Sequence, residues 1–100
     1  MSLDWATLTD GDLVVLSIAG RDKAFAEIMS RYRQPVFRLI RASLRDPEEA
    51  LDLTQETFIS AYQALPRFDA GRPMRAWLFA IAMRLAAHHS EFPLRPQRAR

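Results

Sequence analysis

The sequence predicts an all-α domain, a compact bundle of about four helices. Ala, Leu and Arg are the commonest residues, and Gly occurs only three times, a composition that favours helices. Apolar residues recur at steps of three and four positions and do not alternate as they would along strands. Hydrophobic residues make up 49% of the 100 residues, enough for one modest core and too many for a disordered chain.

The first helix is expected from about Asp10 to Ala19. Asp10 is a candidate cap for the free backbone N–H groups of its first turn. Its apolar stripe consists of Leu13, Val14 and Leu16. Gly20 follows directly, and glycine commonly ends a helix because it tolerates left-handed backbone angles.

A second, longer helix is expected to start after Asp22, a good N-cap residue, and to continue to about Leu44. Its buried stripe consists of Phe25, Ile28, Met29, Tyr32, Val36, Leu39 and Ile40. Pro35 interrupts the stripe, and proline either kinks a helix or splits it, here near residues 33–34. The apolar phase is the same on both sides of Pro35, which favours one kinked but continuous helix.

The third helix has the clearest start in the sequence. Asp46 can accept from free backbone donors, and Pro47 suits the first helical position. Glu48 and Glu49 then face the positive end of the helix dipole. The buried stripe consists of Ala50, Leu53, Thr57, Phe58, Ala61 and Leu65. We expect the helix to run to about Leu65, where Pro66 stops it.

A loop over residues 66–72 leads to the fourth helix, which Pro73 opens and which ends near His88–His89. Its inward-facing residues are Met74, Trp77, Leu78, Ile81, Ala82 and Leu85. Residues 90–100 contain two prolines and three arginines without an apolar period. We therefore expect one domain over residues 1–89, followed by a disordered or linker-like tail over residues 90–100.

Several function classes lack the residues that they need. Without Cys, the chain has no disulfide or thiolate chemistry, and it shows neither a Gly-rich phosphate loop nor paired carboxylates in an apolar setting. His88 and His89 are adjacent, so on a helix they point about 100° apart and are poorly placed to hold one metal ion. We expect no enzyme activity, no metal and no cofactor. No signal peptide is visible, and the longest uncharged apolar run, residues 13–20, is too short for a membrane span, which suits a cytoplasmic protein.

The net charge of +2 is unevenly distributed. Residues 1–60 hold seven basic and ten acidic side chains, whereas residues 61–100 hold seven basic and two acidic ones. A basic C-terminal part suggests an anionic partner, although a solvated arginine-rich face gives the same pattern.

Two candidate surfaces emerge from the helical steps. The first is a strip on the third helix, formed by Asp52, Gln55, Glu56 and Ile59 on the side away from the core stripe. An apolar side chain among acids suits a partner helix, and a solvated face remains the alternative. The second surface is the loop and the exposed side of the fourth helix, where arginines alternate with aromatic residues. Single-stranded nucleic acid needs this combination, because cations pair with phosphates while bases stack on rings. For Phe68, a loop aromatic, packing against the end of the bundle is the alternative.

The motifs resemble domain two of bacterial sigma factors of the extracytoplasmic-function (ECF) type, part of the sigma-70 superfamily. Residues 46–58 read D-P-E-E-A-L-D-L-T-Q-E-T-F, and the family typically reads D-P-x-x-A-E-D-L-x-Q-E-T-F. Upstream, Ala24-Phe25 and Tyr32 resemble the family's A-F-x-x-L-x-x-x-Y helix. Downstream, residues 76–78 (A-W-L) and 81–82 (I-A) resemble its W-L-x-x-I-A signature. The matches extend from Asp10 to about His89 in the family's order.

The resemblance implies a transcription initiation factor domain with two partners. The strip of Asp52, Gln55, Glu56 and Ile59 would bind the clamp helices of the RNA polymerase β′ subunit. The non-template strand of the promoter −10 element would be recognised and melted by Arg67, Phe68, Asp69, Gly71, Arg72, Arg75, Phe79, Arg84 and His88. Base capture from a duplex costs a few kcal/mol, which pocket and backbone contacts offset.

Three residues depart from the family pattern. Leu51 replaces the usual Glu beside the strip, Arg84 stands where Asn is usual, and His88 where Asp is usual. The preferred −10 sequence is therefore left open, since an arginine reads a guanine or holds a phosphate.

The family's second domain, a helix-turn-helix that reads the −35 element, has no counterpart before residue 100, which suggests a fragment that ends in the interdomain linker. An anti-sigma factor is a further expected partner. The alternative function is a helical interaction module, or decoy, that binds an anti-sigma regulator without contacting DNA.

Overall fold

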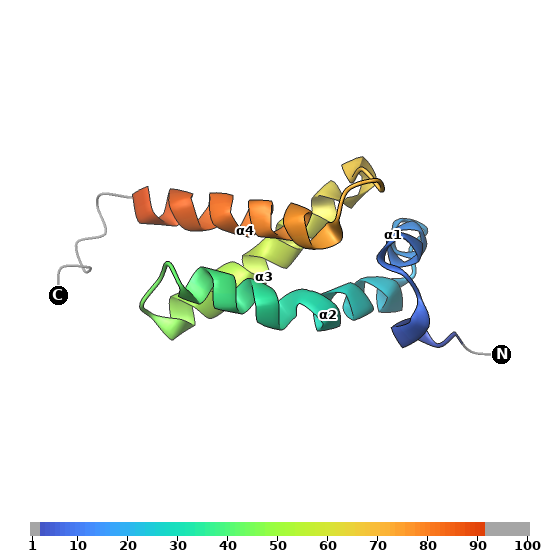
Figure 1. The fold of residues 1–100 in the computed structure, drawn as a ribbon, viewed down its shortest axis with the longest axis horizontal. Coiled ribbons are helices and arrows are strands. Elements are labelled where there is room, and N and C mark those ends of the chain that lie inside the picture. Colours follow the sequence, from blue (N-terminus) through green and yellow to red (C-terminus); the bar gives the residue numbers. More distant parts are fainter. Residues whose placement is uncertain (1–2, 92–100) are drawn as a thin grey trace.

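Four α-helices and two short 3₁₀-helices make up residues 3–91, the part of the chain that the computed structural model describes, and no strand occurs among these residues (Figure 1). The elements are η1 (Trp5–Thr7), α1 (Asp10–Ile18), α2 (Asp22–Arg41), α3 (Pro47–Ala64), η2 (Leu65–Arg67) and α4 (Met74–Glu91). The all-α class and all four expected helices are confirmed. The short η1 was not expected, because a single turn is too short to show an apolar period. Most of the expected tail lies outside the described residues.

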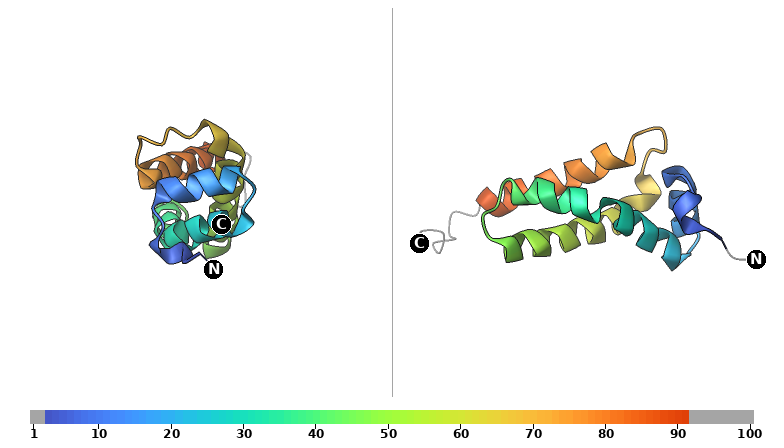
Figure 2. Two further views of the ribbon diagram at one scale, coloured as in Figure 1. Left: turned by 90° about the vertical axis from the view of Figure 1, so that its right-hand side faces the viewer. Right: turned by 60° about the horizontal axis from the view of Figure 1, so that its bottom comes forward.

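The helices α2, α3 and α4 pack on one another in all three pairs, and α1 packs against α2 and η2. In Figure 1 α2 and α4 run along the length of the molecule, with α3 crossing between them. Figure 2 shows α1 lying across one end of these three helices. The arrangement leaves one side of α3 exposed to solvent, and the strip of Asp52, Gln55, Glu56 and Ile59 lies there.

The helix α1 is capped at both ends by local hydrogen bonds. Thr9 is its N-cap: the Thr9 Oγ1 accepts from the Asp12 backbone N–H at 3.0 Å, and the Asp12 carboxylate accepts from the Thr9 N–H at 3.3 Å. The expected cap, Asp10, is instead the first residue of the helix. Gly20 has a φ of +99°, and the N–H groups of Gly20 and Arg21 donate to the carbonyls of Ser17 and Leu16. This is the Schellman ending that the glycine predicts.

The helix α2 is continuous through Pro35, as the apolar phase predicts. Its expected cap was wrong, because Asp22 is already helical and the preceding Arg21 makes no side-chain cap bond. The helix ends at Arg41, before the expected Leu44. The Arg41 Nη1 donates to the backbone carbonyls of Leu44 and Arg45 at 3.0 and 2.9 Å, which closes the turn and keeps Leu44 buried.

The helix α3 starts where the sequence predicts, whereas α4 differs slightly at both ends. Asp46 caps α3 as expected, accepting from the Glu48 N–H at 2.9 Å, with Pro47 at the first position. The helix gives way to η2 at Leu65, where Pro66 follows. Pro73 precedes α4 instead of opening it, and α4 extends past His89 to Glu91.

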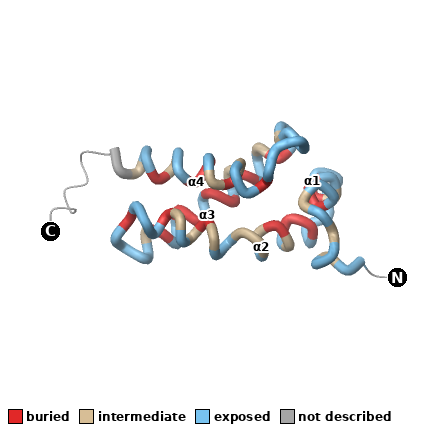
Figure 3. Tube along the Cα trace, in the orientation of Figure 1, coloured by how far each residue is buried: buried red, intermediate tan, exposed pale blue. Residues whose placement is uncertain are grey.

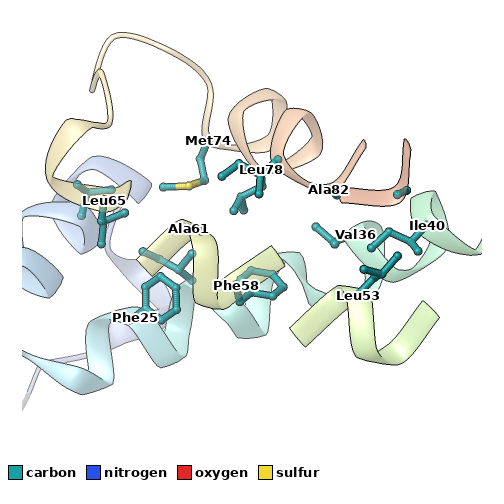
Figure 4. Close-up of a cluster of buried hydrophobic side chains, with 14 of the residues drawn as sticks. Phe25, Val36, Ile40, Leu53, Phe58, Ala61, Leu65, Met74, Leu78 and Ala82 are labelled. Carbon is teal, nitrogen blue, oxygen red and sulfur yellow. The ribbon is translucent and has the colours of Figure 1, made fainter. Parts of the chain in front are cut away.

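The core lies between α2, α3 and α4 (Figures 3 and 4). The whole expected stripe of α3 is buried, and so are Phe25, Ile28, Val36 and Ile40 of α2. Met29, Tyr32 and Leu39 are only partly buried at the edge of the core. In Figure 4 Phe25 and Phe58 lie next to each other, with Met74 and Leu78 of α4 above them. The rings of Phe25 and Phe58 pack edge to face, with their centres 6.5 Å apart. This rigid centre fixes how the helices that carry the candidate surfaces are oriented.

Candidate functional site

The strip on α3 lies on its solvent side, as its helical phase predicts. Asp52, Gln55 and Glu56 are all exposed, and the side chain of Ile59 is 58% exposed. Leu53 and Thr57, which alternate with them in sequence, are buried against the other helices. The strip is therefore free to contact another molecule without any change in the core.

An apolar groove of about 810 Å³ adjoins this strip, between α2 and α3. Gln55 and Ile59 of the strip line it, whereas Asp52 and Glu56 lie outside it. The other lining residues are Phe25, Met29, Arg33, Gln34, Phe37, Leu51, Thr54, Phe58, Tyr62 and Gln63. Leu51 and Tyr62 are about half exposed, so the groove presents open apolar surface.

Sequence reasoning missed the groove because its walls come from two helices. The exposed Leu51 was the available signal, since an apolar residue occupies a position on the solvent side of α3. The groove also gives Leu51 a role: where a Glu is usual in the resembling family, this side chain extends the apolar wall.

The loop between η2 and α4 is built by two of the candidate DNA-contacting residues. The Asp69 carboxylate accepts from the Gly71 N–H at 3.0 Å, and the Asp69 carbonyl accepts from the Arg72 N–H at 2.8 Å. Asp69 and Gly71 thus shape the turn that presents the exposed Arg72. Phe68 is half-buried, with its ring centre 4.7 Å from that of Trp77, so it packs on the end of the bundle.

The candidate residues of α4 lie on two different flanks of the helix. Arg75 and Phe79 form one pair, with the guanidinium 5.1 Å from the ring centre. Arg84 lies nine positions after Arg75, about 180° around the helix. His88 follows Arg84 by four positions and shares its flank, where it is exposed. The structure therefore divides the basic and aromatic residues between two flanks instead of one continuous face.

A second pocket, of about 440 Å³, lies on the flank of Arg84, between α4 and the end of α3 with η2. It is lined by Ser60, Gln63, Ala64, Arg67, Trp77, Ile81 and Arg84. Only Arg67 and Arg84 were expected at a site. The lining residues recur at steps of three and four positions. Ser60, Gln63 and Arg67 come from α3 and η2, and Trp77, Ile81 and Arg84 come from α4. Within residues 3–91, neither arginine forms a salt bridge.

A polar cluster holds the N-terminal elements in place. The Arg31 guanidinium pairs with both Asp10 and Glu27 at 3.0 Å, and the Tyr32 hydroxyl donates to the Asp10 carboxylate. Burial, followed by the hydrogen bond to Asp10, raises the pKa of Tyr32 to about 12. The cluster joins α1 to α2.

His89, near the end of α4, takes part in a contact between helices. The His89 Nε2 lies 3.3 Å from the Glu49 Oε1, which links α4 to the start of α3. No three His, Asp or Glu side chains come together as a metal site in the part of the chain that the structure describes. Among these same residues, no helix is long and apolar enough to cross a bilayer.

The fold and its surfaces define a helical binding domain. It has an apolar groove between α2 and α3 and basic residues on two flanks of α4. Residues 28–90 match the family model of sigma-70 region 2. The chain therefore belongs to the sigma-70 region 2 family, whose members are transcription initiation factors and not enzymes.

Relatives place the chain with the ECF group. It is 42% identical over 88 residues to the ECF RNA polymerase sigma factor SigC of Mycobacterium tuberculosis, a match that covers 84% of this chain and 47% of SigC. It is 38% identical over 66 residues to SigW of Bacillus subtilis, covering 66% of this chain and 35% of SigW. The chain thus spans about half or less of the length of these relatives.

Two solved structures share the fold. One is the NMR structure of an engineered region 2 of sigmaE in complex with GTAAAA, with a TM-score of 0.77 and 36% identity, covering 89% of this chain and 90% of that one. The other is CnrH in complex with the cytosolic domain of CnrY, with a TM-score of 0.73 and 30% identity, covering 79% of this chain and 51% of CnrH. The resemblance and the four-helix fold expected from the sequence are confirmed.

Proposed function

We propose that this domain binds the clamp helices of the RNA polymerase β′ subunit through α3 and holds and melts the promoter −10 element with its basic flanks. The main observation in support of clamp-helix binding is the exposed strip of Asp52, Gln55 and Glu56, which borders an open apolar groove. Helix docking uses this combination, since an apolar seam supplies affinity and flanking charges set register. In this proposal Ile59 and Leu51 supply apolar contact, and the protein acts in the cytoplasm with the polymerase.

Support for the DNA half comes from charge and from a relative. The engineered region 2 of sigmaE forms a complex with GTAAAA. In this chain Arg67, Arg72 and Arg84 are exposed and form no salt bridge among residues 3–91. Arginines without acidic partners, beside aromatic rings, suit phosphates and unstacked bases. We assign the unit that does this to residues 1–89 and the start of an interdomain linker to residues 90–100.

Capture of the chain by isolated β′ clamp helices tests the polymerase half. We expect the double variant Asp52→Ala with Gln55→Ala, and separately Ile59→Ser, to weaken capture at least tenfold. Both change exposed side chains, so the unfolding transition serves as a check that the fold is intact. The control is Asp22→Ala, which removes an exposed acid from α2, outside the strip. Unchanged capture by the double variant would show that the docking assignment is wrong.

The second candidate function is that of an interaction module that binds an anti-sigma factor through the groove and makes no DNA contact. The size and apolar lining of the groove favour this candidate, and the related CnrH forms a complex with another protein, the cytosolic domain of CnrY. Binding of single-stranded −10 DNA discriminates between the two functions. Salt-dependent binding supports the initiation factor. No detectable binding, even with core polymerase supplied, supports the interaction module.

A further inference from the structure

The pocket between α3 and α4 combines an aromatic wall with two cations. Trp77 and Ile81 form its apolar side, and Arg67 and Arg84 contribute the charge. Its volume of about 440 Å³ lies within the range of small-ligand pockets, which hold roughly 300–1,000 Å³. No carboxylate lines it. The pocket therefore suits a planar group that carries hydrogen-bond acceptors and is attached to an anion.

The aromatic wall is held in place from outside the pocket. The ring of Phe68 packs on Trp77 with a centre separation of 4.7 Å. The indole is thus restrained by packing before anything binds, and a base that stacks on it pays little of the cost of ordering the ring.

The chemistry of the rim selects among the four bases. The Arg84 guanidinium is a pure donor with a fork geometry, and guanine presents two adjacent acceptors, O6 and N7, on one edge. Adenine places an amino donor beside N7, and the two acceptors of thymine, O2 and O4, flank an N–H donor. Unpaired cytosine has one adjacent acceptor pair, N3 and O2, so the contact to N7 is what distinguishes guanine from cytosine. The hydroxyl of Ser60 and the amide of Gln63 both donate and accept, so neither of them opposes guanine.

We propose that this pocket is a base-reading subsite for single-stranded DNA that prefers guanine, with Arg84 donating to O6 and N7, Trp77 stacking on the base and Arg67 pairing with a neighbouring phosphate. The inference rests on the proposed binding of the non-template strand and adds the base preference of one subsite. The pocket shares Arg67 with the loop over residues 66–73 but is distinct from the rest of it, because Asp69, Gly71 and Arg72 do not line the pocket.

The test compares a short oligothymidylate strand with the same strand carrying one central guanine. Binding is measured by fluorescence anisotropy and by the shift of the Trp77 indole N–H resonance. The only other tryptophan, Trp5, lies in η1 outside the pocket and serves as the internal reference. We expect the guanine strand to bind about five- to tenfold more tightly, the lower part of the range for a bidentate arginine–guanine contact. Replacing guanine by 7-deazaguanine, which lacks N7, should remove most of this preference.

Variants separate base reading from charge. Arg84→Ala and Arg84→Lys should both abolish the guanine preference, since lysine keeps the charge but lacks the fork. Arg38→Ala, which removes an exposed arginine from α2, should preserve it.

Each contrary outcome has a distinct meaning. Equal binding of the two strands by the unmodified chain overturns the inference and leaves the proposed function intact. If Arg84→Ala weakens the binding of both strands by the same factor, Arg84 contacts a phosphate, and the inference is overturned as well. If no strand binds, even with core polymerase present, the proposed DNA function fails and this inference fails with it.

Discussion

The Arg31 guanidinium and the Asp10 carboxylate form a salt bridge of 3.0 Å that joins α2 to the first turn of α1. The same guanidinium donates to the backbone carbonyls of Trp5 and Leu8 at 3.0 and 2.6 Å. One partly buried side chain thereby fastens η1, the following loop and α1 to the long helix.

Replacing Arg31 with alanine should lower the free energy of unfolding by about 2 kcal/mol, because Asp10 and the partly buried carbonyls lose their partner. Urea denaturation followed by circular dichroism measures this change. Arg38→Ala, which removes an exposed arginine from the same helix, should change stability by no more than about 0.5 kcal/mol. Equal effects of the two variants would contradict the role given to Arg31.

The partial burial of Tyr32, together with its hydrogen bond to Asp10, predicts a pH dependence on the alkaline side. The folded state raises the pKa of Tyr32 from an ordinary value near 10 to about 12, and so favours the protonated phenol. The resulting stabilisation is present in full below about pH 10 and is lost as the pH rises towards 12. Tyr32→Phe should remove this part of the decline in the free energy of unfolding.

Absorbance of the tyrosinate ion checks the same shift directly. The chain has two tyrosines, so Tyr62→Phe leaves Tyr32 as the only titrating phenol. Its titration midpoint should lie near pH 12 in the folded protein, and a midpoint near 10 would show that Tyr32 is neither buried nor bound to Asp10 in solution.

The glycines at the two ends of α1 should respond to alanine in opposite directions. Gly20 has a φ of +99° and open space where an alanine methyl would lie, so Gly20→Ala costs about 1 kcal/mol from backbone strain alone. Gly11 lies in the first turn of α1, where the nearest atom to a Cβ, the Thr9 Oγ1, is 3.9 Å away. Gly11→Ala should therefore stabilise the protein by about 0.5 kcal/mol. Thermal denaturation of the pair provides a matched comparison.

Arg75 should act on DNA through charge alone, because its guanidinium lies against Phe79, on the flank away from the Arg84 pocket. Arg75→Ala should weaken binding to all single strands by a similar factor. It should also reduce the slope of log affinity against log salt by roughly 0.7, the contribution of one phosphate contact. A sequence-dependent loss would instead show that Arg75 reads a base.

Local signals predicted the ends of α3 and the glycine ending of α1 well, because each depends on a few consecutive residues. Asp46 with Pro47 is an example. The same reasoning wrongly expected Asp10 and Asp22 to be caps. Thr9 caps α1 through the capping box, and α2 begins at Asp22 without any side-chain cap bond. Of the candidate site, the strip was correctly placed on the solvent side of α3, but Trp77 and Gln63 were not recognised as pocket residues.

The sequence by itself determined the all-α class, the four helices, the buried stripe of α3 and the family resemblance, because helix periodicity, capping and motif spacing are properties of short segments. The tertiary structure alone decided which side chains from different helices share a surface. It created the groove beside Ile59 and joined Arg67 and Arg84 in one pocket. The physical reason is that these relationships depend on the packing and rotation of whole helices about a common core, which no local pattern of residues specifies.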